Sequence, residues 1–371
     1  WQGDPGAAFT VETRDEAGAW SPAGAIEATP ADEGPDDGSI DARGRPGSNV
    51  SEALWVGDGV TGVRVRLDDG VAVDVDLHAV ESPPAVAPEG VAVAAGGPIF
   101  SGGGAGPGSR LFVAVVTLAM AGLVVVGFRW RRFPRRGRRL ATGLLLVASI
   151  GLGACVPPPA PAPAPAPVPG LDNLISRAGW GANENLRLAN CPGGPDYMSA
   201  VKLAVVHHTV NSNSYSAGQG PQLVRGIYGY HTQSLGYCDI AYNFLVDRYG
   251  NVYEGRYGGT DRAVMGAHAR GFNTASTGVA LIGDFRTAVP PAEAIDALVQ
   301  LLAWKLGVHG INPTVSFSYQ TAGNEKWAPG TTVTLSPITY HAFTGHSECP
   351  GTQVINRMGQ IATAVVARMG Y

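Results

Sequence analysis

A long uncharged run divides this chain and limits what it can fold into. Residues 111–128 (LFVAVVTLAMAGLVVVGF) carry no charged side chain over 18 residues. A helix of that length spans about 27 Å, just enough to cross a bilayer. Because the run has no polar face, a buried helix of a soluble domain is the less favoured alternative. Seven arginines follow within 129–139. Since arginine-rich loops stay on the cytoplasmic side of a membrane, both flanking parts are predicted to lie outside the cytoplasm.

A second apolar run, 140–154, ends at Cys155 and leaves two interpretations open. The basic residues, the apolar stretch and the final LGAC (152–155) resemble a bacterial lipoprotein signal, whose cysteine carries the lipid. In that case Cys155 would begin a separate mature protein. In the alternative, the two apolar runs form an intact membrane hairpin. Both interpretations anchor the chain in the cell envelope, with the membrane as a partner and the C-terminal part extracytoplasmic.

Charge is strongly segregated along the 371 residues. Residues 1–100 carry 18 acidic and 5 basic side chains, whereas 101–140 contain eight arginines and no acidic residue. The overall net charge of −4 excludes a generally basic nucleic-acid-binding protein, so no nucleic-acid partner is expected. The Gly-rich stretch 93–110 and the Pro-Ala stretch 156–170 are typical of linkers, and the second is expected to form an extended stalk of about 40 Å. The predicted parts are therefore an accessory domain (1–92), a membrane segment (111–155) and a C-terminal domain (171–371).

The N-terminal part is predicted to be a small, acidic, β-rich domain. Residues 62–67 and 71–77 alternate apolar and polar side chains with period two, which is typical of strands. The sequence DDG at 68–70 predicts a tight turn, so we expect the two segments to pair as a hairpin. The acidic stretch 32–37 matches no trusted calcium-loop spacing, which favours a solvated loop. Nothing in this part indicates catalysis.

The C-terminal domain mixes strand and helix patterns. It is therefore predicted to be α/β, with a central mixed β-sheet flanked by helices. Residues 202–209 (KLAVVHHT) are apolar on both faces, as expected for a strand inside a sheet. Further strands are predicted at 241–246, 252–254 and 278–282, the first two forming a hairpin. Helices are predicted at 221–234, at 291–306, closed by Gly307, and at 352–369.

Seven of the eight histidines lie in this C-terminal domain, together with Cys349. A catalytic zinc ion typically takes three protein ligands and keeps one position for water. One histidine of the pair His207–His208, with His341 and Cys349, would supply such a set. Neighbouring strand residues face opposite sides, so only one of that pair can reach the metal. The spacing does not say which, and each histidine taken singly is more typical of a hydrogen-bonded structural residue.

Five stretches of the C-terminal domain resemble the type 2 N-acetylmuramoyl-L-alanine amidases and the peptidoglycan recognition proteins that share their fold. They follow one another in family order: ISRAGWGA (175–182), VVHHTV (205–210), GYCDIAYNFLVDRYGNVYEGR (236–256), GAHARGFNTASTGVALIGDF (266–285) and HAFTGHSECPG (341–351). Stretches near the N-terminus, such as TRDEAGAWSP, resemble a small β domain that precedes the catalytic part in some large actinobacterial amidases. The resemblance implies the amidase fold, a Zn²⁺ cofactor and peptidoglycan, or its muropeptides, as the partner.

Position by position, the resemblance also implies roles for individual residues. The family's three zinc ligands fall on His207, His341 and Cys349. Its catalytic tyrosine falls on Tyr242, whose hydroxyl would hydrogen-bond the zinc-bound water or the oxyanion. Ser347, the second residue predicted to be catalytic, stands where relatives have Thr or Lys and is still able to donate a hydrogen bond. His231 also recurs in the family, and we expect it to be structural. Substrate contact or support is implied for His268, Asn273 and Arg256.

The chain departs from the family pattern at three places near this site. Relatives usually read His-Arg-Asp at the second ligand, whereas this chain reads HAF (341–343), so a customary polar support is missing. His346, three residues before Cys349, is unusual and would compete for the metal or support a ligand. After Arg256 the chain reads Tyr-Gly-Gly in place of the Gly-Trp of many diaminopimelate-preferring relatives. The preference for a particular stem peptide is therefore left open.

The four cysteines have separate predicted fates. Cys349 is assigned to zinc, and Cys155 to lipid if the chain is processed. Cys191 and Cys238, 47 residues apart, are then available to pair in an oxidising compartment. Two buried free thiols are the alternative.

These patterns predict an envelope-anchored zinc hydrolase that cleaves the amide between N-acetylmuramic acid and L-alanine in peptidoglycan. The main alternative is a peptidoglycan-binding module of the same fold without turnover. Non-catalytic relatives typically lose the cysteine ligand, and this chain keeps Cys349, which favours catalysis. A protein with a purely structural zinc is a third hypothesis, but it would need four protein ligands.

Overall fold

The computed structural model describes residues 2–3, 8–26, 34–44, 60–69, 72–73, 171 and 173–371. The two apolar runs, the arginine cluster, Cys155 and both linkers lie outside these residues, so the membrane anchor stays a prediction. Within the ranges just given, no helix combines the length and the apolar character needed to cross a membrane.

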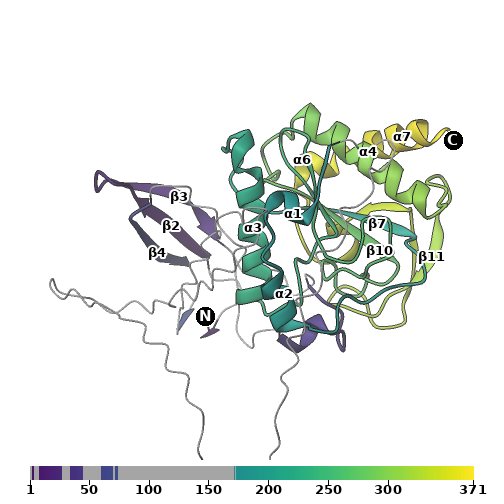
Figure 1. The fold of residues 1–371 in the computed structure, drawn as a ribbon, viewed down its shortest axis with the longest axis horizontal. Coiled ribbons are helices and arrows are strands. Elements are labelled where there is room, and N and C mark those ends of the chain that lie inside the picture. Colours follow the sequence, from purple (N-terminus) through teal and green to yellow (C-terminus); the bar gives the residue numbers. More distant parts are fainter. Residues whose placement is uncertain are drawn as a thin grey trace, which may run out of the picture. The chain divides into compact units, whose positions relative to one another are not determined.

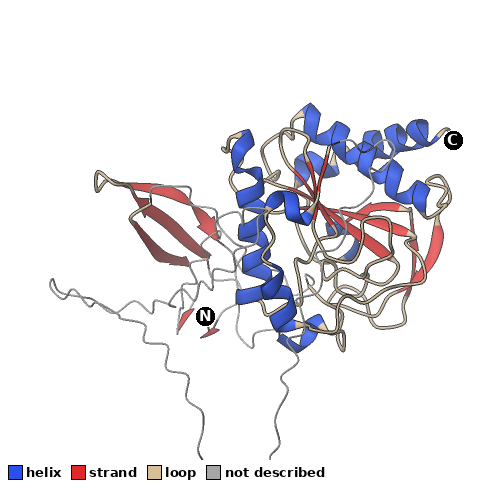
Figure 2. Cartoon of the chain, in the orientation of Figure 1, coloured by secondary structure: helices blue, strands red, loops and turns tan. Residues whose placement is uncertain are grey.

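A six-stranded sheet forms the centre of the C-terminal domain (Figure 1, Figure 2). In spatial order its strands are β13 (Ile338–Tyr340), β7 (Leu203–His208), β10 (Ser276–Leu281), β8 (Phe244–Val246), β9 (Val252–Glu254) and β6 (Leu174–Ile175). All neighbouring pairs are parallel except β8 and β9, which form the predicted antiparallel hairpin. The prediction of a mixed sheet is therefore confirmed for this domain, with 203–208 as an interior strand.

Alternate residues of the strands enter hydrophobic clusters on opposite faces of the sheet. Val206 of β7 belongs to the cluster formed with α4 (Ala292–Val308) and α7 (Met358–Met369). Leu245 of β8 belongs to the cluster formed with α3 (Gly220–Gly229). Figure 1 accordingly shows α3 on one side of the sheet and α4 and α7 on the other. Burial of one such aliphatic side chain stabilises the fold by about 1.5–3 kcal/mol, and the two layers hold the strand ends in place.

The three predicted helices form, but each differs in detail from the prediction. The 221–234 helix appears as α3 followed by a wider π-helical turn, η3 (Tyr230–Ser234). α4 runs past Gly307 and ends before Gly310, whose φ of +64° suits the left-handed position of a Schellman cap. The 352–369 helix is broken into α6 (Thr352–Ile355) and α7, because the N–H of Arg357 bonds to the carbonyl of Val354 in a tighter turn.

The remaining elements of the C-terminal domain are short. They are α1 (Arg177–Trp180), α2 (Glu184–Asn190), η2 (Ala217–Gln219), α5 (His341–Thr344) and the antiparallel pair β11 (Phe317–Gln320) and β12 (Thr332–Leu335). Cys191, just after α2, forms a disulfide with Cys238, with the two Cα atoms 5.2 Å apart. The disulfide therefore ties α2 to the loop that leads into β8.

The described N-terminal strands pair differently from the prediction. They are β1 (Gln2–Gly3), β2 (Ala8–Arg14), β3 (Trp20–Ile26), β4 (Gly62–Asp69) and β5 (Ala72–Val73), with the short η1 (Asp41–Gly44) between β3 and β4. β4 pairs with β2 in a three-stranded antiparallel sheet, and β5 pairs with β1, so the predicted hairpin between 62–67 and 71–77 is wrong. Period-two alternation marks a strand but does not choose its partner, and pairing with β2 buries Phe9 and Val11.

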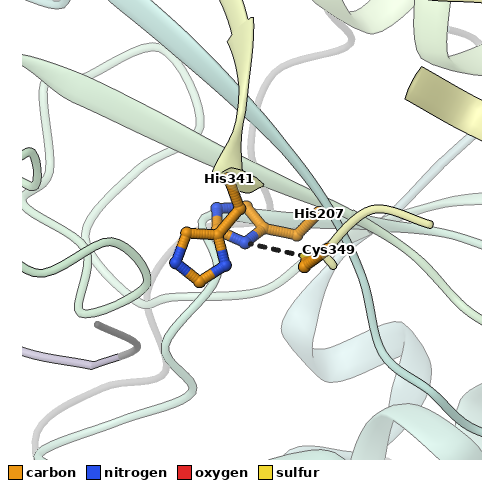
Figure 3. A group of neighbouring side chains, drawn as sticks. All are labelled: His207, His341 and Cys349. Atoms are coloured by element: carbon orange, nitrogen blue, oxygen red, sulfur yellow. Dashed lines mark hydrogen bonds between the residues drawn. The ribbon is translucent and has the colours of Figure 1, made fainter. Parts of the chain in front are cut away.

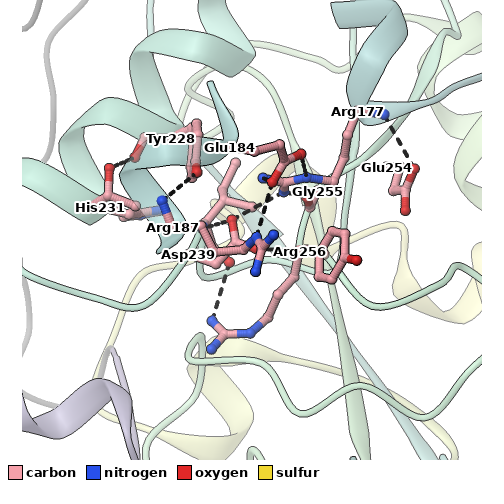
Figure 4. Close-up of polar contacts among 12 residues, drawn as sticks. Arg177, Glu184, Arg187, Tyr228, His231, Asp239, Glu254, Gly255 and Arg256 are labelled. Carbon is pink, nitrogen blue, oxygen red and sulfur yellow. Dashed lines mark hydrogen bonds and ion pairs between the residues drawn. The ribbon is translucent and has the colours of Figure 1, made fainter. Parts of the chain in front are cut away.

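A buried arginine joins three separate parts of the C-terminal domain (Figure 4). Arg177, at the start of α1, places Nη1 3.1 Å from Asp239 and Nε 2.7 Å from Glu184 of α2. It also donates to the carbonyl of Gly255, after β9. Although burial raises the pKa of Glu184, Arg177 and Arg187 hold it below its ordinary value. This network fixes the loops on both sides of the β8–β9 hairpin.

Candidate metal centre

Two parallel strands bring His207 and His341 together. Tyr340 of β13 pairs with Val206 of β7, so His341, which begins α5, and His207 lie side by side at the carboxyl ends of the two strands. The two imidazole centroids are 4.7 Å apart, and neither side chain is exposed. His207 is four residues from Leu203 in β7, so both side chains point to the same face of the sheet. Leu203 belongs to a hydrophobic cluster separate from the one that contains α4, so this is the face that α4 does not cover.

Cys349 reaches the same point from the loop after α5 (Figure 3). Its Sγ lies 3.6 Å from Nδ1 of His207, and the backbone N–H of His208 donates to Sγ at 3.3 Å. One donor atom from each of His207, His341 and Cys349 lies within 4.8 Å of the other two, and all three residues are buried. The structure thus brings together the three residues that the sequence predicted as ligands.

The chemistry and spacing of this cluster fit a zinc ion. Zinc bonds of about 2.0–2.1 Å to nitrogen and about 2.3 Å to sulfur, in tetrahedral geometry, require a nitrogen–sulfur separation of about 3.6 Å. The observed His207–Cys349 distance is 3.6 Å. Burial, with His341 and His268 nearby, holds the pKa of His207 well below its ordinary value. A neutral imidazole is the form that binds a metal, and three ligands leave a tetrahedral ion one further position.

His268 supports His207 from behind. Nε2 of His207 lies 3.0 Å from Nδ1 of His268. If Nδ1 of His207, which faces the cluster, binds a metal, its Nε2 must carry the proton and donate to His268, a typical arrangement for a metal-ligating histidine. Burial lowers the pKa of His268 to about 3, so it remains a neutral acceptor. A Cβ at Gly266 or Gly278 would lie 2.5 or 2.4 Å from the His268 ring, so only glycine leaves room for it. The buried His268 therefore holds the ring of His207 in its orientation.

His208 and His346 lie outside this cluster. Nδ1 of His208 accepts a hydrogen bond from the N–H of Phe285 at 3.2 Å, on the opposite face of β7. Burial lowers the pKa of His208 to about 4, despite the nearby carboxylate of Asp284. His346 is exposed, and the metal-binding group found among the described residues does not include it. The structure therefore separates the two members of the His207–His208 pair as strand geometry requires.

Tyr242 lies against the cluster, two residues before β8. Its ring centroid is 5.2 Å from that of His207, and the side chain is 5 % exposed. The ring of His231 packs against its other side at 5.6 Å, and Nδ1 of His231 accepts the N–H of Ala241 at 3.1 Å. Burial lowers the pKa of His231 to about 3, which keeps this acceptor neutral. His231 thus positions Tyr242, in agreement with its expected structural place.

Two polar side chains hold the turn that carries the second and third ligands. Nζ of Lys326 donates to the carbonyls of Ala342 and Phe343, at 3.0 and 2.9 Å. A cation there satisfies carbonyls at the end of α5, so it supplies a polar support that the HAF sequence lacks. Oγ of Ser347 accepts the N–H of Cys349 at 3.1 Å. No local pattern marks Lys326, which comes from the loop between β11 and β12, and the sequence analysis missed it.

Two of the three residues expected to contact substrate, Arg256 and Asn273, already have partners from the N-terminal part. Arg256 is ion-paired with Asp41, and Nδ2 of Asn273 donates to Asp36 at 2.9 Å. Oδ1 of Asn273 accepts the N–H of His268 at 2.8 Å. The predicted solvated loop at 32–37 is therefore wrong for Asp36, which is only 6 % exposed. Its hydrogen-bond donors lie more than 200 residues away in the chain.

Comparison with known proteins gives consistent similarities. A family model described as N-acetylmuramoyl-L-alanine amidase matches residues 197–352. Peptidoglycan-recognition protein SC2 of Drosophila melanogaster is 31 % identical over 188 residues, covering 50 % of this chain and 84 % of that protein. Peptidoglycan-recognition protein 1 of Holotrichia diomphalia is 35 % identical over 130 residues, covering 35 % of this chain and 60 % of the relative. The structure of Drosophila PGRP-LB is 26 % identical and covers 50 % of this chain and 92 % of that one, with a TM-score of 0.39.

Proposed function

The chain belongs to the family of type 2 N-acetylmuramoyl-L-alanine amidases and peptidoglycan recognition proteins, and from this premise we propose that it is a zinc-dependent amidase. Its substrate is the amide between N-acetylmuramic acid and L-alanine in peptidoglycan. The observation that supports catalysis is the buried set of His207, His341 and Cys349, with Tyr242 against it. The predicted anchor at 111–155 would hold this activity at the outer face of the membrane.

The chain's own residues prepare the site for this hydrolysis. Zinc, when bound to His207, His341 and Cys349, supplies a Lewis acid that polarises a carbonyl and lowers the pKa of water towards neutrality. His268 holds the proton on Nε2 of His207, which keeps Nδ1 directed at the cluster. The N–H of His208 stabilises negative charge on the sulfur of Cys349. The hydroxyl of Tyr242 would donate to the oxyanion that develops on the scissile carbonyl.

Recognition without turnover is the second candidate, because the named relatives are recognition proteins. One assay separates the two functions. Purified peptidoglycan is incubated with the protein, and released stem peptides with a free L-alanine amine are quantified by mass spectrometry. We expect release that a chelator abolishes and added zinc restores, since chelation removes the Lewis acid. Binding to the same peptidoglycan with no release, in the presence of zinc, would replace the amidase proposal with recognition.

Tyr242→Phe tests the catalytic step apart from metal binding. The change removes one hydroxyl and leaves the ring that packs against His207 and His231. We expect about one zinc per chain, as in the unmodified protein, and a fall in kcat of roughly 10²-fold or more, the effect of losing one oxyanion donor. Zinc content by mass spectrometry and single-turnover rates would check both. A kcat within a few-fold of the unmodified protein would remove Tyr242 from the mechanism.

A further inference from the structure

Residues 34–44, here called the acidic segment, lie on the residues assigned to substrate contact. The segment comes from the N-terminal part, yet Asp36 and Asp41 are 6 % and 3 % exposed. Carboxylates are rarely buried unless hydrogen-bonded or paired with a cation. Both find their partners in the C-terminal domain, so the segment is held there by specific contacts.

Asp36 is bound at the loop beside the metal cluster. Its Oδ1 accepts the N–H of Gly271 at 2.6 Å and the side-chain amide of Asn273 at 2.9 Å. The same amide donates to the carbonyl of Gly34 at 2.9 Å. Asn273 in turn holds the backbone of His268, which hydrogen-bonds to His207. A continuous series of hydrogen bonds therefore runs from the acidic segment to a metal ligand.

Asp41 is the second buried carboxylate of the acidic segment, and it also binds the C-terminal domain. One of its oxygens pairs with Nη2 of Arg256, and the other accepts the N–H of Cys238 at 2.8 Å. The Arg256 side chain is 2 % exposed, so no free guanidinium is presented to an incoming ligand. A ligand that uses the Nη2 donor of Arg256 must first displace Asp41, which already accepts from it.

At Gly34 the backbone of the acidic segment lies close to Tyr237 of the C-terminal domain. A Cβ at this position would lie 2.5 Å from the hydroxyl of Tyr237, and its φ of +106° suits only glycine. Another residue at position 34 would adopt a strained backbone and would have to displace the hydroxyl of Tyr237. Docking of the segment depends on shape at Gly34 as well as on charge at Asp36 and Asp41.

We propose that the acidic segment is an intramolecular inhibitor, which occupies the muropeptide site through Asp36 and Asp41 and must leave before substrate binds. This regulation rests on the proposed function, because the blocked residues, Arg256 and Asn273, are two of those assigned to the peptidoglycan ligand. A protein whose open form is only a fraction of the population binds with an apparent Kd raised by that fraction. Release of the segment is therefore expected to strengthen binding while leaving the chemical step unchanged.

Two independent variants of the full chain release the segment. Asp36→Asn with Asp41→Asn removes both charges, and Gly34→Val blocks docking sterically without changing charge. The matched control, Glu16→Gln with Asp296→Asn, also removes two negative charges, but at exposed side chains outside the acidic segment. Binding of zinc-loaded protein to soluble muramyl tetrapeptides of the diaminopimelate and lysine types is measured by calorimetry, with kcat and KM from peptide release. Far-UV circular dichroism checks that each variant is folded.

We expect both releasing variants to bind at least about tenfold more tightly, as for an open fraction of a tenth or less, with lower KM and unchanged kcat. The control is expected to stay within about threefold, because neither of its side chains lies in the acidic segment and exposed charges contribute little. Affinities within twofold of the unmodified protein in both variants would overturn the inhibitor while the proposed function stands. Tighter binding without any hydrolysis would support the inhibitor and overturn the amidase. Absence of binding in every protein would overturn both.

Discussion

Cys349→Ala is expected to abolish zinc binding and, with it, all measurable release of stem peptides. Sγ of Cys349 lies 3.6 Å from Nδ1 of His207 in a buried cluster, so removing it leaves two histidines and no anionic donor. Loss of an outer-shell partner already weakens metal binding by about 10–100-fold, and loss of a ligand is expected to exceed that. Competition with a chromophoric chelator measures the Kd for zinc in the variant and in the unmodified protein.

His346→Ala is the matched control for this experiment. His346 is exposed and three residues from Cys349, so the control removes a donor from the same loop without touching the cluster. We expect unchanged zinc content and near-normal hydrolysis. Full zinc occupancy in Cys349→Ala, lost only when His346 is also replaced, would transfer the third ligand to His346. That result would contradict the assignment made from the geometry.

Arg177→Met is expected to reduce the free energy of unfolding by about 3–5 kcal/mol, the usual effect of breaking a buried ion pair by removing one partner. The side chains of Arg177 and Asp239 are 5 % and 3 % exposed, so the remaining carboxylate would stay buried beside an uncharged neighbour (Figure 4). The carbonyl of Gly255 would lose its donor as well. Urea denaturation followed by tryptophan fluorescence measures the change.

Two further variants show which contact of Arg177 accounts for the lower free energy of unfolding. Glu184→Gln leaves Arg177 paired with Asp239, and since the Glu184 side chain is 37 % exposed, a change of about 1 kcal/mol or less is expected. Arg177→Lys keeps the charge but not the planar donors that reach three partners, so an intermediate loss is expected. If Arg177→Met costs no more than Glu184→Gln, the network is not a source of stability.

Local patterns predicted four of the eight described C-terminal strands, β7 to β10, because each is a short apolar run whose burial needs no knowledge of its neighbour. The strand at 203–208 and the hairpin at 244–254 are examples. Helix ends were less well predicted. Gly307 looked like the end of α4, yet the left-handed residue is Gly310, since the cap depends on which carbonyls remain to be satisfied. Likewise the alternating pattern at 62–67 could not identify β2 as its partner.

Residue patterns alone predicted the candidate ligands by type, and family resemblance assigned their positions. Strand alternation allowed only one histidine of 207 and 208, and family resemblance selected His207. The structure gives the physical reason, since parallel pairing of β13 with β7 places His341 beside that residue. Lys326 and the support from His268 depend on loops that meet only in the folded chain.

The sequence by itself determined the α/β class, the family and the residue types of the metal cluster, because each of these is recognised from short stretches of neighbouring residues. Tertiary structure alone decided which strands pair, which side chains orient the ligands and where the acidic segment lies. Asp36 reads as a solvated residue in its local context, yet its donors are 235 and 237 positions away. A buried carboxylate is stable only when folding brings hydrogen-bond donors to it. When those donors are distant in the sequence, no local pattern can predict the contact.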